Sequence, residues 1–205
     1  GSASLFGKQT ETSPASTERV RLPATPSVVS LTAMNLSNAT LKEIDTFTAD
    51  LLPTMIGVRR ELHQHPERSG QESWTSAYLA QLLDFLGLPV RRHVGGFGLV
   101  ADLVVDPSAP TLAFRVDMDA LPLEEINAVA YRSRAAGLMH AGGHDVHSAI
   151  GFGTAAVLTH FRHLLSHNIR FIFQPEEEEI TGALRMIRAG VLTRPVPDAI
   201  FGLHV

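Results

Sequence analysis

Apolar residues follow two alternating periods along the chain. From Leu41 to Leu62 they recur at helical spacing, and we expect Pro53 to begin a second helical piece after Asp50. Helices are predicted at residues 41–62, 73–86, 147–165 and 181–189. Strands are predicted where apolar runs lie between turn residues, at 90–94, 99–105, 111–116, 169–173 and 199–205. This alternation predicts an α/β fold, in which helices cover a sheet.

The first forty residues differ in composition from the rest of the chain. Residues 1–40 are rich in Ser, Thr, Ala and Pro and have no sustained apolar period, which predicts a flexible N-terminal arm. The remainder, 41–205, can bury a core, because 44% of the 205 residues are hydrophobic. We therefore expect one domain, or one domain and part of a second.

Charge and cysteine content narrow the possible functions. The net charge is −4, with 17 Lys and Arg against 21 Asp and Glu and no dense basic run. A small-molecule partner is therefore expected, and neither nucleic acid nor a membrane. Cysteine is absent, so any metal must be held by His, Asp or Glu. No stretch approaches the ~18 apolar residues of a membrane span, and no secretory signal pattern opens the sequence, which predicts a cytoplasmic protein.

Two acidic residues follow the predicted strand at 111–116. Asp117 and Asp119 stand where functional loops leave the sheet of an α/β protein. Capping of a turn, or a salt bridge to Arg115, is an alternative explanation for them. This segment alone leaves the two interpretations open.

Three histidines lie within eight positions of a glycine-bearing loop that leads into a helix. They are His140, His144 and His147, and imidazole is the commonest metal ligand among neutral side chains. The alternative is a helix cap built by Asp145, which would explain that residue but not the further histidines. The pattern favours a metal site.

Four adjacent acids, residues 176–179, follow the predicted strand at 169–173. Their mutual repulsion is relieved by a cation, and one acid can bind a metal while its neighbour acts as a general base. The alternative is the solvated acidic first turn of a helix, which accounts for Glu179. His204, alone in an apolar strand, becomes a candidate ligand only because the other features accompany it.

In this order, the motifs resemble the metallopeptidase family, family twenty, that contains aminoacylases, hippurate hydrolases, dimeric carboxypeptidases and plant auxin-conjugate amidohydrolases. The matching segments are residues 60–67, 115–122, 140–147, 173–178 and 202–205. The resemblance implies a zinc-exopeptidase type of catalytic domain, phosphorylase/hydrolase-like, with a mixed sheet flanked by helices. Residues 41–205 would be the N-terminal part of that domain.

The resemblance also assigns roles to individual residues. It implies that Glu177 is the general base and that Asp117 is an active-site acid that organises the metal site. The implied metal ligands are His144, Glu178 and His204. His65 would lie near the site.

The sequence departs from this family in two places. Gly142 stands where relatives carry a cysteine that bridges two metals, so the site is expected to hold one metal ion or two. Without a thiolate ligand, manganese, iron or cobalt becomes a better candidate relative to zinc. The sequence also ends at Val205, one residue after His204, whereas relatives continue through a lid and dimerisation domain that is absent here. A C-terminal fragment or second chain is therefore expected to complete the enzyme, which would also form a homo-oligomer.

The implied function is metal-dependent hydrolysis of a C–N bond, with divalent manganese, zinc or cobalt as cofactor. The expected substrate is the amide of an N-acyl amino acid or a related conjugate. One alternative is an aminohydrolase that removes the amine from an aromatic ring such as a nitroanthranilate. Another is a non-catalytic fragment that binds a partner chain through an open sheet edge.

Overall fold

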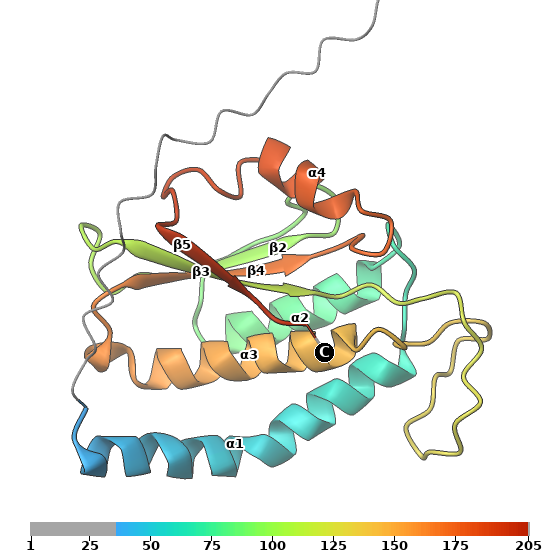
Figure 1. Cartoon of the computed structure of the whole chain (residues 1–205), viewed down its shortest axis with the longest axis horizontal. Helices are drawn as coiled ribbons and strands as arrows, with labels where there is room; N and C mark the ends of the chain where they lie inside the picture. Colours follow the sequence, from blue (N-terminus) through green and yellow to red (C-terminus); the bar gives the residue numbers. More distant parts are fainter. Residues whose placement is uncertain (1–35, 205) are drawn as a thin grey trace, which may run out of the picture.

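The computed structural model describes residues 36–204, which form a sheet with helices on both faces (Figure 1). Most of the flexible arm predicted for residues 1–40 lies outside the described residues. Its last part is helical, because Ser37 caps the first helix by accepting a hydrogen bond from the Thr40 N–H at 3.1 Å. No helix within residues 36–204 is long and apolar enough to cross a membrane.

The sheet is mixed, as the family resemblance implied. Its strands are β1 (Val90–Arg91), β2 (Leu99–Leu103), β3 (Thr111–Asp117), β4 (Asn168–Gln174) and β5 (Ala199–Gly202). They lie in the order β1-β2-β4-β3-β5. β2 pairs antiparallel with β1 and β4, whereas β3 pairs parallel with both β4 and β5. β4 therefore lies between β2 and β3, which both precede it in the sequence.

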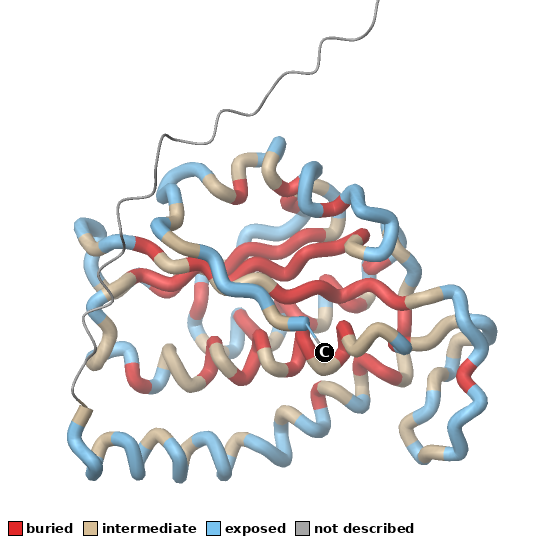
Figure 2. The backbone as a smooth tube through the Cα atoms, viewed as in Figure 1, coloured by how far each residue is buried: buried red, intermediate tan, exposed pale blue. Residues whose placement is uncertain are grey.

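Four α-helices cover the sheet. They are α1 (Asn38–Gln64), α2 (Ser73–Phe85), α3 (His144–His160) and α4 (Gly182–Arg188), and a short 3-10 turn, Arg162–Leu164, follows α3. The first three lie on one face of the sheet, with α1 packed outside α3, and α4 lies on the other face (Figure 1). The central strands are buried between these layers (Figure 2). The predicted α/β architecture is thus confirmed.

The element boundaries differ from the predictions in instructive places. α1 runs through Pro53 as one helix and bends partway along (Figure 1), because proline removes one backbone donor without ending a helix that packs on α3. α3 begins at His144, three residues earlier than predicted, directly after Gly143 in a left-handed conformation (φ 80°). The strand predicted at 199–205 ends at Gly202. The early start of α3 places His144 in the first turn of the helix.

The core lies mainly between the sheet and the α1–α3 layer. Fully buried side chains there include Leu79, Leu83, Leu99, Phe171 and Phe173. A smaller cluster under α4 includes Met186 and Ile172. Because Phe171 and Phe173 face the larger cluster while Ile172 faces the smaller one, β4 is buried on both sides. This rigid centre fixes the positions at which β3 and β4 end.

Candidate metal centre

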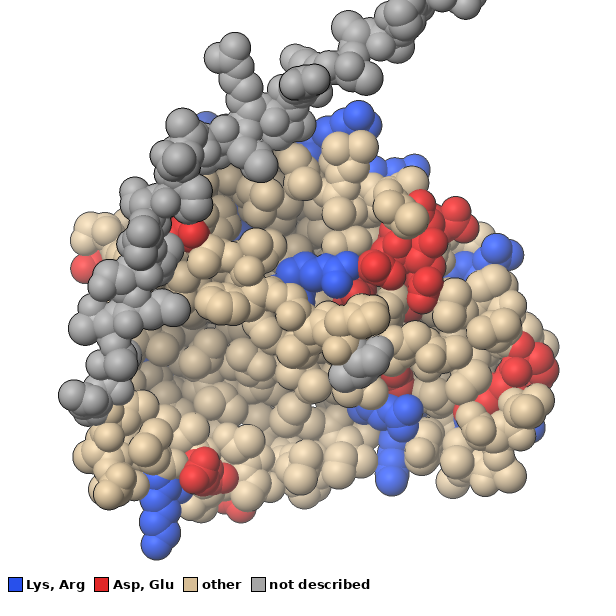
Figure 3. Space-filling model, viewed as in Figure 1, with Lys and Arg blue, Asp and Glu red and all other residues tan. Residues whose placement is uncertain are grey.

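The parallel strands β3 and β4 end side by side at one edge of the sheet. Asp117 at the end of β3 is paired with Gln174 at the end of β4. The loops that follow these strands, and the first turn of α3, therefore meet at the carboxyl ends of the strands, where α/β proteins commonly place their sites. Acidic side chains gather on the surface where the chain leaves β4 (Figure 3).

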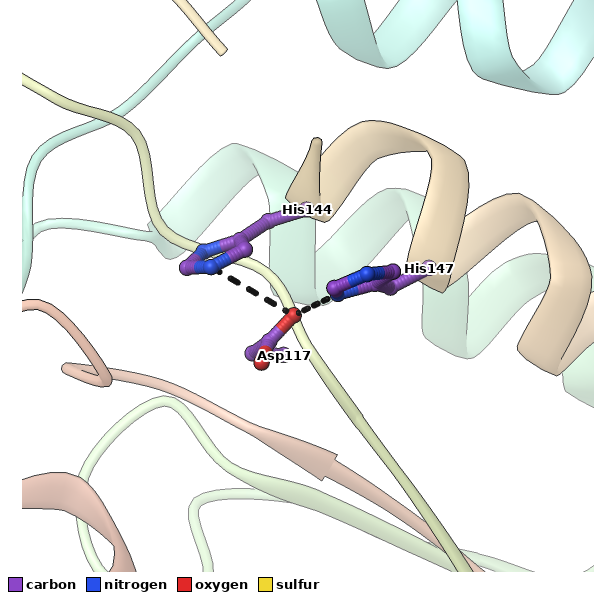
Figure 4. Close-up of side chains that lie close together, drawn as sticks. All are labelled: Asp117, His144 and His147. Carbon is purple, nitrogen blue, oxygen red and sulfur yellow. Dashed lines mark hydrogen bonds and ion pairs between the residues drawn. The ribbon is translucent and has the colours of Figure 1, made fainter. Parts of the chain in front are cut away.

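Asp117 is buried and hydrogen-bonded on every side. Its Oδ1 accepts a hydrogen bond from His147 Nδ1 at 2.6 Å, and its Oδ2 accepts one from Arg115 at 2.6 Å. The His144 ring lies on the other side of the same carboxylate, with Nε2 3.7 Å from Oδ1 (Figure 4). The salt bridge to Arg115 that was considered as an alternative is present, and it coexists with the contacts to the two histidines.

His144 has one ring nitrogen occupied and one directed at carboxylates. Its Nδ1 lies 2.9 Å from the Asp119 carbonyl oxygen, which can only accept, so Nδ1 carries the hydrogen and donates it. Nε2 then faces Glu177 Oε2 at 3.7 Å and Glu178 Oε1 at 3.9 Å. A backbone carbonyl bonded to one nitrogen is the usual way to orient an imidazole whose other nitrogen binds a metal.

Asp119 contacts both His144 and the backbone of Glu178. The sequence interpretation gave this residue no specific role. Its Oδ2 accepts hydrogen bonds from Ser69 Oγ at 2.6 Å and from the Glu178 backbone N–H at 3.1 Å. Burial opposes ionisation, but the hydrogen bonds from His144, Ser69 and the backbone outweigh it and lower the pKa of Asp119 to about 2. Asp119 is therefore an anion that ties His144 to the acidic loop.

The electrostatics of the site favour a positive charge at its centre. Burial alone would lower the pKa of His144, yet its hydrogen bond to Asp119 and the nearby Asp117 charge raise it to about 9. Burial raises the pKa of Glu178, and the neighbouring Glu177 charge adds to that effect. The carboxylates thus hold a proton on His144, and a divalent cation can replace that proton.

The donor atoms fit a divalent metal. Two groups of possible ligand atoms converge within 4.8 Å, namely Asp117 with His144 and His147, and His144 with Glu177 and Glu178. In the first group the short Asp117–His147 hydrogen bond already joins two of the donors. The second group offers an imidazole nitrogen and two carboxylates. The nitrogen lies beyond hydrogen-bond distance from either carboxylate, as expected for ligands that share one ion.

His204 is placed close to these groups without joining them. Its ring centre lies 6.3 Å from that of His147, and its side chain is exposed beyond the end of β5. Neither of the converging donor groups within residues 36–204 includes it. Its role as a ligand therefore remains a prediction.

Gly142 lies directly beside the donor atoms. A Cβ at this position would stand 2.9 Å from Glu178 Oε1 and 3.5 Å from His144 Nε2. Any side chain at 142 would therefore point into the centre, whereas glycine supplies no ligand. The candidate ligand atoms of the second group, His144 with Glu177 and Glu178, are one nitrogen and two oxygens.

Three further histidines lie outside the two donor groups found among the described residues. His65 bonds the Glu61 carbonyl at 2.9 Å and packs against Trp74. His63, which was not singled out, bonds Asp145 at 2.7 Å in the first turn of α3. His140 is buried and belongs to neither donor group among the described residues. The nearness of His65 to the site stays a prediction.

Comparisons with known proteins agree with this geometry. Residues 113–205 match Peptidase family M20/M25/M40. The probable hydrolase sll0100 of Synechocystis is 44% identical over 164 residues, 80% of this chain and 41% of the relative. An N-acetyl-L-cysteine deacetylase of Bacillus subtilis is 41% identical over 150 residues, 73% of this chain and 36% of the relative.

A solved structure is similar to this chain in both fold and sequence. The Bacillus subtilis YXEP protein, described as a dinuclear metal binding peptidase of the M20 family, superposes with a TM-score of 0.71 at 38% identity, over 74% of this chain and 42% of that one. The chain is therefore similar to members of Peptidase family M20/M25/M40, and its fold is similar to the N-terminal part of their catalytic domains. It spans about two fifths of the length of the relatives it matches.

Proposed function

We propose that this chain provides the metal-binding centre and the general base of a metal-dependent hydrolase that cleaves a C–N bond. The proposed substrate is a small molecule, the amide of an N-acyl amino acid or a related conjugate. One observation carries the proposal: the Nε2 atom of His144 faces two carboxylates and has its partner nitrogen fixed by a backbone carbonyl. A deacetylase of an N-acetyl amino acid among the relatives supports the choice of substrate class.

In this proposal the residues divide the work between binding and proton transfer. His144 Nε2 and Glu178 hold the cation, with His204 as a further ligand and Asp117 as the anion that orients the histidines. A bound divalent cation lowers the pKa of water and polarises a carbonyl group. Glu177, whose side chain is 37% exposed against 29% for that of Glu178, accepts the proton of the attacking water and returns it to the departing amine.

The donor set also guides the choice of metal. Imidazole and carboxylate without thiolate favour manganese, cobalt or iron over zinc, which remains an alternative. We propose one ion in place of two, since Gly142 supplies no ligand where a side chain would reach the donors. Metal content of the purified protein, measured by elemental mass spectrometry, tests both points.

The remainder of the enzyme is expected to come from a C-terminal segment or a second chain. The chain spans about two fifths of its relatives, and β5 has exposed Ile200 and Phe201 side chains at the sheet edge. We further propose a homo-oligomer that acts in the cytoplasm. Native mass spectrometry on protein from the full gene, expressed in its host, tests these points. A 22.2 kDa species that is alone and metal-free would favour a non-catalytic binding fragment instead.

The Glu177→Gln variant tests the proposed mechanism. The substitution keeps the size of the side chain and removes its basicity, so turnover should fall by about 10²–10⁴-fold or more while metal content stays unchanged. Release of amino acids from N-acyl substrates measures the amidohydrolase activity. Release of ammonia from amino-aromatic acids measures the alternative aminohydrolase activity, which the altered ligand position at Gly142 keeps open. A substantially active Glu177→Gln protein would remove the base assignment.

A further inference from the structure

Glu176 precedes the two acids of the site and has an unusual backbone conformation. Its φ angle is 52°, in the left-handed region that non-glycine residues rarely adopt. The residue is nonetheless buried, with 5% of its surface exposed. A strained backbone persists only where the surroundings hold it in place. The contacts of Glu176 therefore determine how the chain turns from β4 into Glu177 and Glu178.

Every polar group of Glu176 is engaged. Its carbonyl oxygen accepts hydrogen bonds from the backbone N–H groups of Thr181 and Gly182, at 3.3 and 3.2 Å. Its carboxylate accepts hydrogen bonds from Thr181 Oγ1 at 2.6 Å and from Arg185 at 2.8 Å. Its backbone N–H donates to Glu72 Oε1 at 2.8 Å. The first two contacts are local, whereas the third comes from a distant part of the sequence.

Glu72 is a buried acid that the proposed mechanism does not use. It lies directly before α2, and none of its surface is exposed. No ion pair to its carboxylate is found within residues 36–204, and burial raises its pKa above the usual range. Burial of a carboxyl group without a basic partner costs stability. The buried carboxyl group of Glu72 accepts a hydrogen bond from the Glu176 backbone N–H, which fixes the position of that peptide group.

Hydrogen bonds therefore fix the backbone of the acidic loop, residues 176–179, on both sides of Glu177. Glu72 holds the N–H of Glu176, and Asp119 holds the N–H of Glu178 at 3.1 Å. Glu177 lies between the two fixed peptide groups. Both anchors are buried carboxyl groups that reach the loop from other elements. Such support limits the reorganisation needed when a base and a ligand must act in a defined geometry.

We infer that Glu72 is a positioning residue, which acts through the Glu176 backbone to aim Glu177 and Glu178 at the metal centre beside His144. This inference rests on the proposed function. It adds a specific chemical requirement, because position 72 must offer a hydrogen-bond acceptor to the Glu176 N–H and does not need a negative charge.

Two substitutions at position 72 in the intact protein separate the acceptor from the charge. Glu72→Gln keeps an oxygen acceptor, whereas Glu72→Met has a similar size and keeps none. We expect Glu72→Met to bind Mn²⁺ or Co²⁺ about 10–100-fold more weakly and to lose kcat with KM changed less than about threefold. Glu72→Gln should stay within about threefold of the wild type in both. Metal affinity is measured by titration calorimetry, and the melting temperature of each variant is recorded in parallel.

The outcomes distinguish this inference from the function on which it rests. A Glu72→Met protein with unchanged metal affinity and kcat, whether or not its melting temperature falls, would overturn the positioning role alone. Equal losses in Glu72→Gln and Glu72→Met would also overturn it, because the charge would then matter and not the acceptor. A wild-type protein that binds none of Mn²⁺, Co²⁺ and Zn²⁺ would overturn the proposed function, and this inference with it.

Discussion

Two groups of buried charges lie on the same sheet, and they are balanced in different ways. Arg170 on β4 is 1% exposed, donates to Asp102 on β2 at 2.7 and 2.9 Å, and also bonds backbone carbonyls of residues 191–195. Its charge and its donors are satisfied by the protein. At the carboxyl ends of β3 and β4, four carboxylates instead face one arginine and two imidazoles.

The difference shows which cluster is complete within the described residues and which calls for a cation. A buried arginine with all its partners present stabilises one arrangement of the chain. An excess of carboxylates, of which Asp117 and Asp119 are buried, is unfavourable until a proton or a metal offsets it. The first cluster is therefore expected to govern stability, and the second is expected to govern metal binding. Two predictions test this division, and a third concerns a buried histidine outside both clusters.

The largest effect is expected when His144 is replaced. His144→Ala removes the nitrogen that faces both acids, so affinity for Mn²⁺ or Co²⁺ should fall by about 10³-fold or more, which corresponds to about 4 kcal/mol. Titration calorimetry measures the affinity. His163→Ala, which removes an exposed imidazole just after α3, is the matched control and should bind metal normally. Equal affinities in the two variants would show that the metal lies elsewhere.

Replacement of Arg170 should have the next largest effect, and on stability alone. Arg170→Met leaves the Asp102 carboxylate and several backbone carbonyls without their donor, which should cost about 3–4 kcal/mol of unfolding free energy in urea denaturation. Arg188→Met, at an exposed position of α4, is the control. Metal affinity of the folded Arg170→Met protein should be unchanged. If the folded Arg170→Met protein bound metal more weakly than the wild type, the two clusters would be coupled.

The smallest of the three effects concerns pH and His140, which lies just before the metal-binding loop. Burial lowers its pKa to about 4 against an ordinary value of 6.5, although the nearby Asp145 charge opposes the shift. The unfolded chain therefore binds a proton at this residue between pH 6.5 and 4 while the folded chain does not, so stability falls as the pH is lowered through that range. The loss should reach up to about 3 kcal/mol.

A comparison of His140→Leu with the wild type measures this contribution. The slope of unfolding free energy against pH, between about pH 7 and pH 4.5, should be shallower in His140→Leu. His163→Leu, which removes an exposed imidazole, should keep the wild-type slope. If His140→Leu and the wild type had the same slope, the acid sensitivity would have to come from other buried groups.

The sequence predicted the elements because they depend on local pattern, and the apolar runs identified β2, β3 and β4. The structure brings Asp117, His144, Glu177 and Glu178 together at the ends of β3 and β4. The roles of Glu177 and His204 stay predictions. What could not be predicted depends on strand order: the Glu72–Glu176 contact joins residues 104 positions apart, and the Arg170–Asp102 pair forms only because β4 lies beside β2.

Local patterns also misplaced some boundaries, for physical reasons that the structure makes clear. Pro53 was expected to divide the first helix, but packing of α1 on α3 outweighs the loss of one hydrogen bond. Asp119 was noticed only as a companion of Asp117, although the spacing of two residues already placed both side chains on one face of the extended chain. That spacing was the available signal for its role.

The position of β4 has a consequence for the order in which the protein is assembled. β2 and β3 follow one another in the sequence, yet neither pairs with the other, and each finds its central neighbour only in β4. During synthesis on the ribosome, more than sixty residues are added after Leu103 before that neighbour begins to emerge at Asn168. During that interval β3 has no native partner and β2 can pair only with β1, so apolar surface stays exposed on the nascent chain and can aggregate.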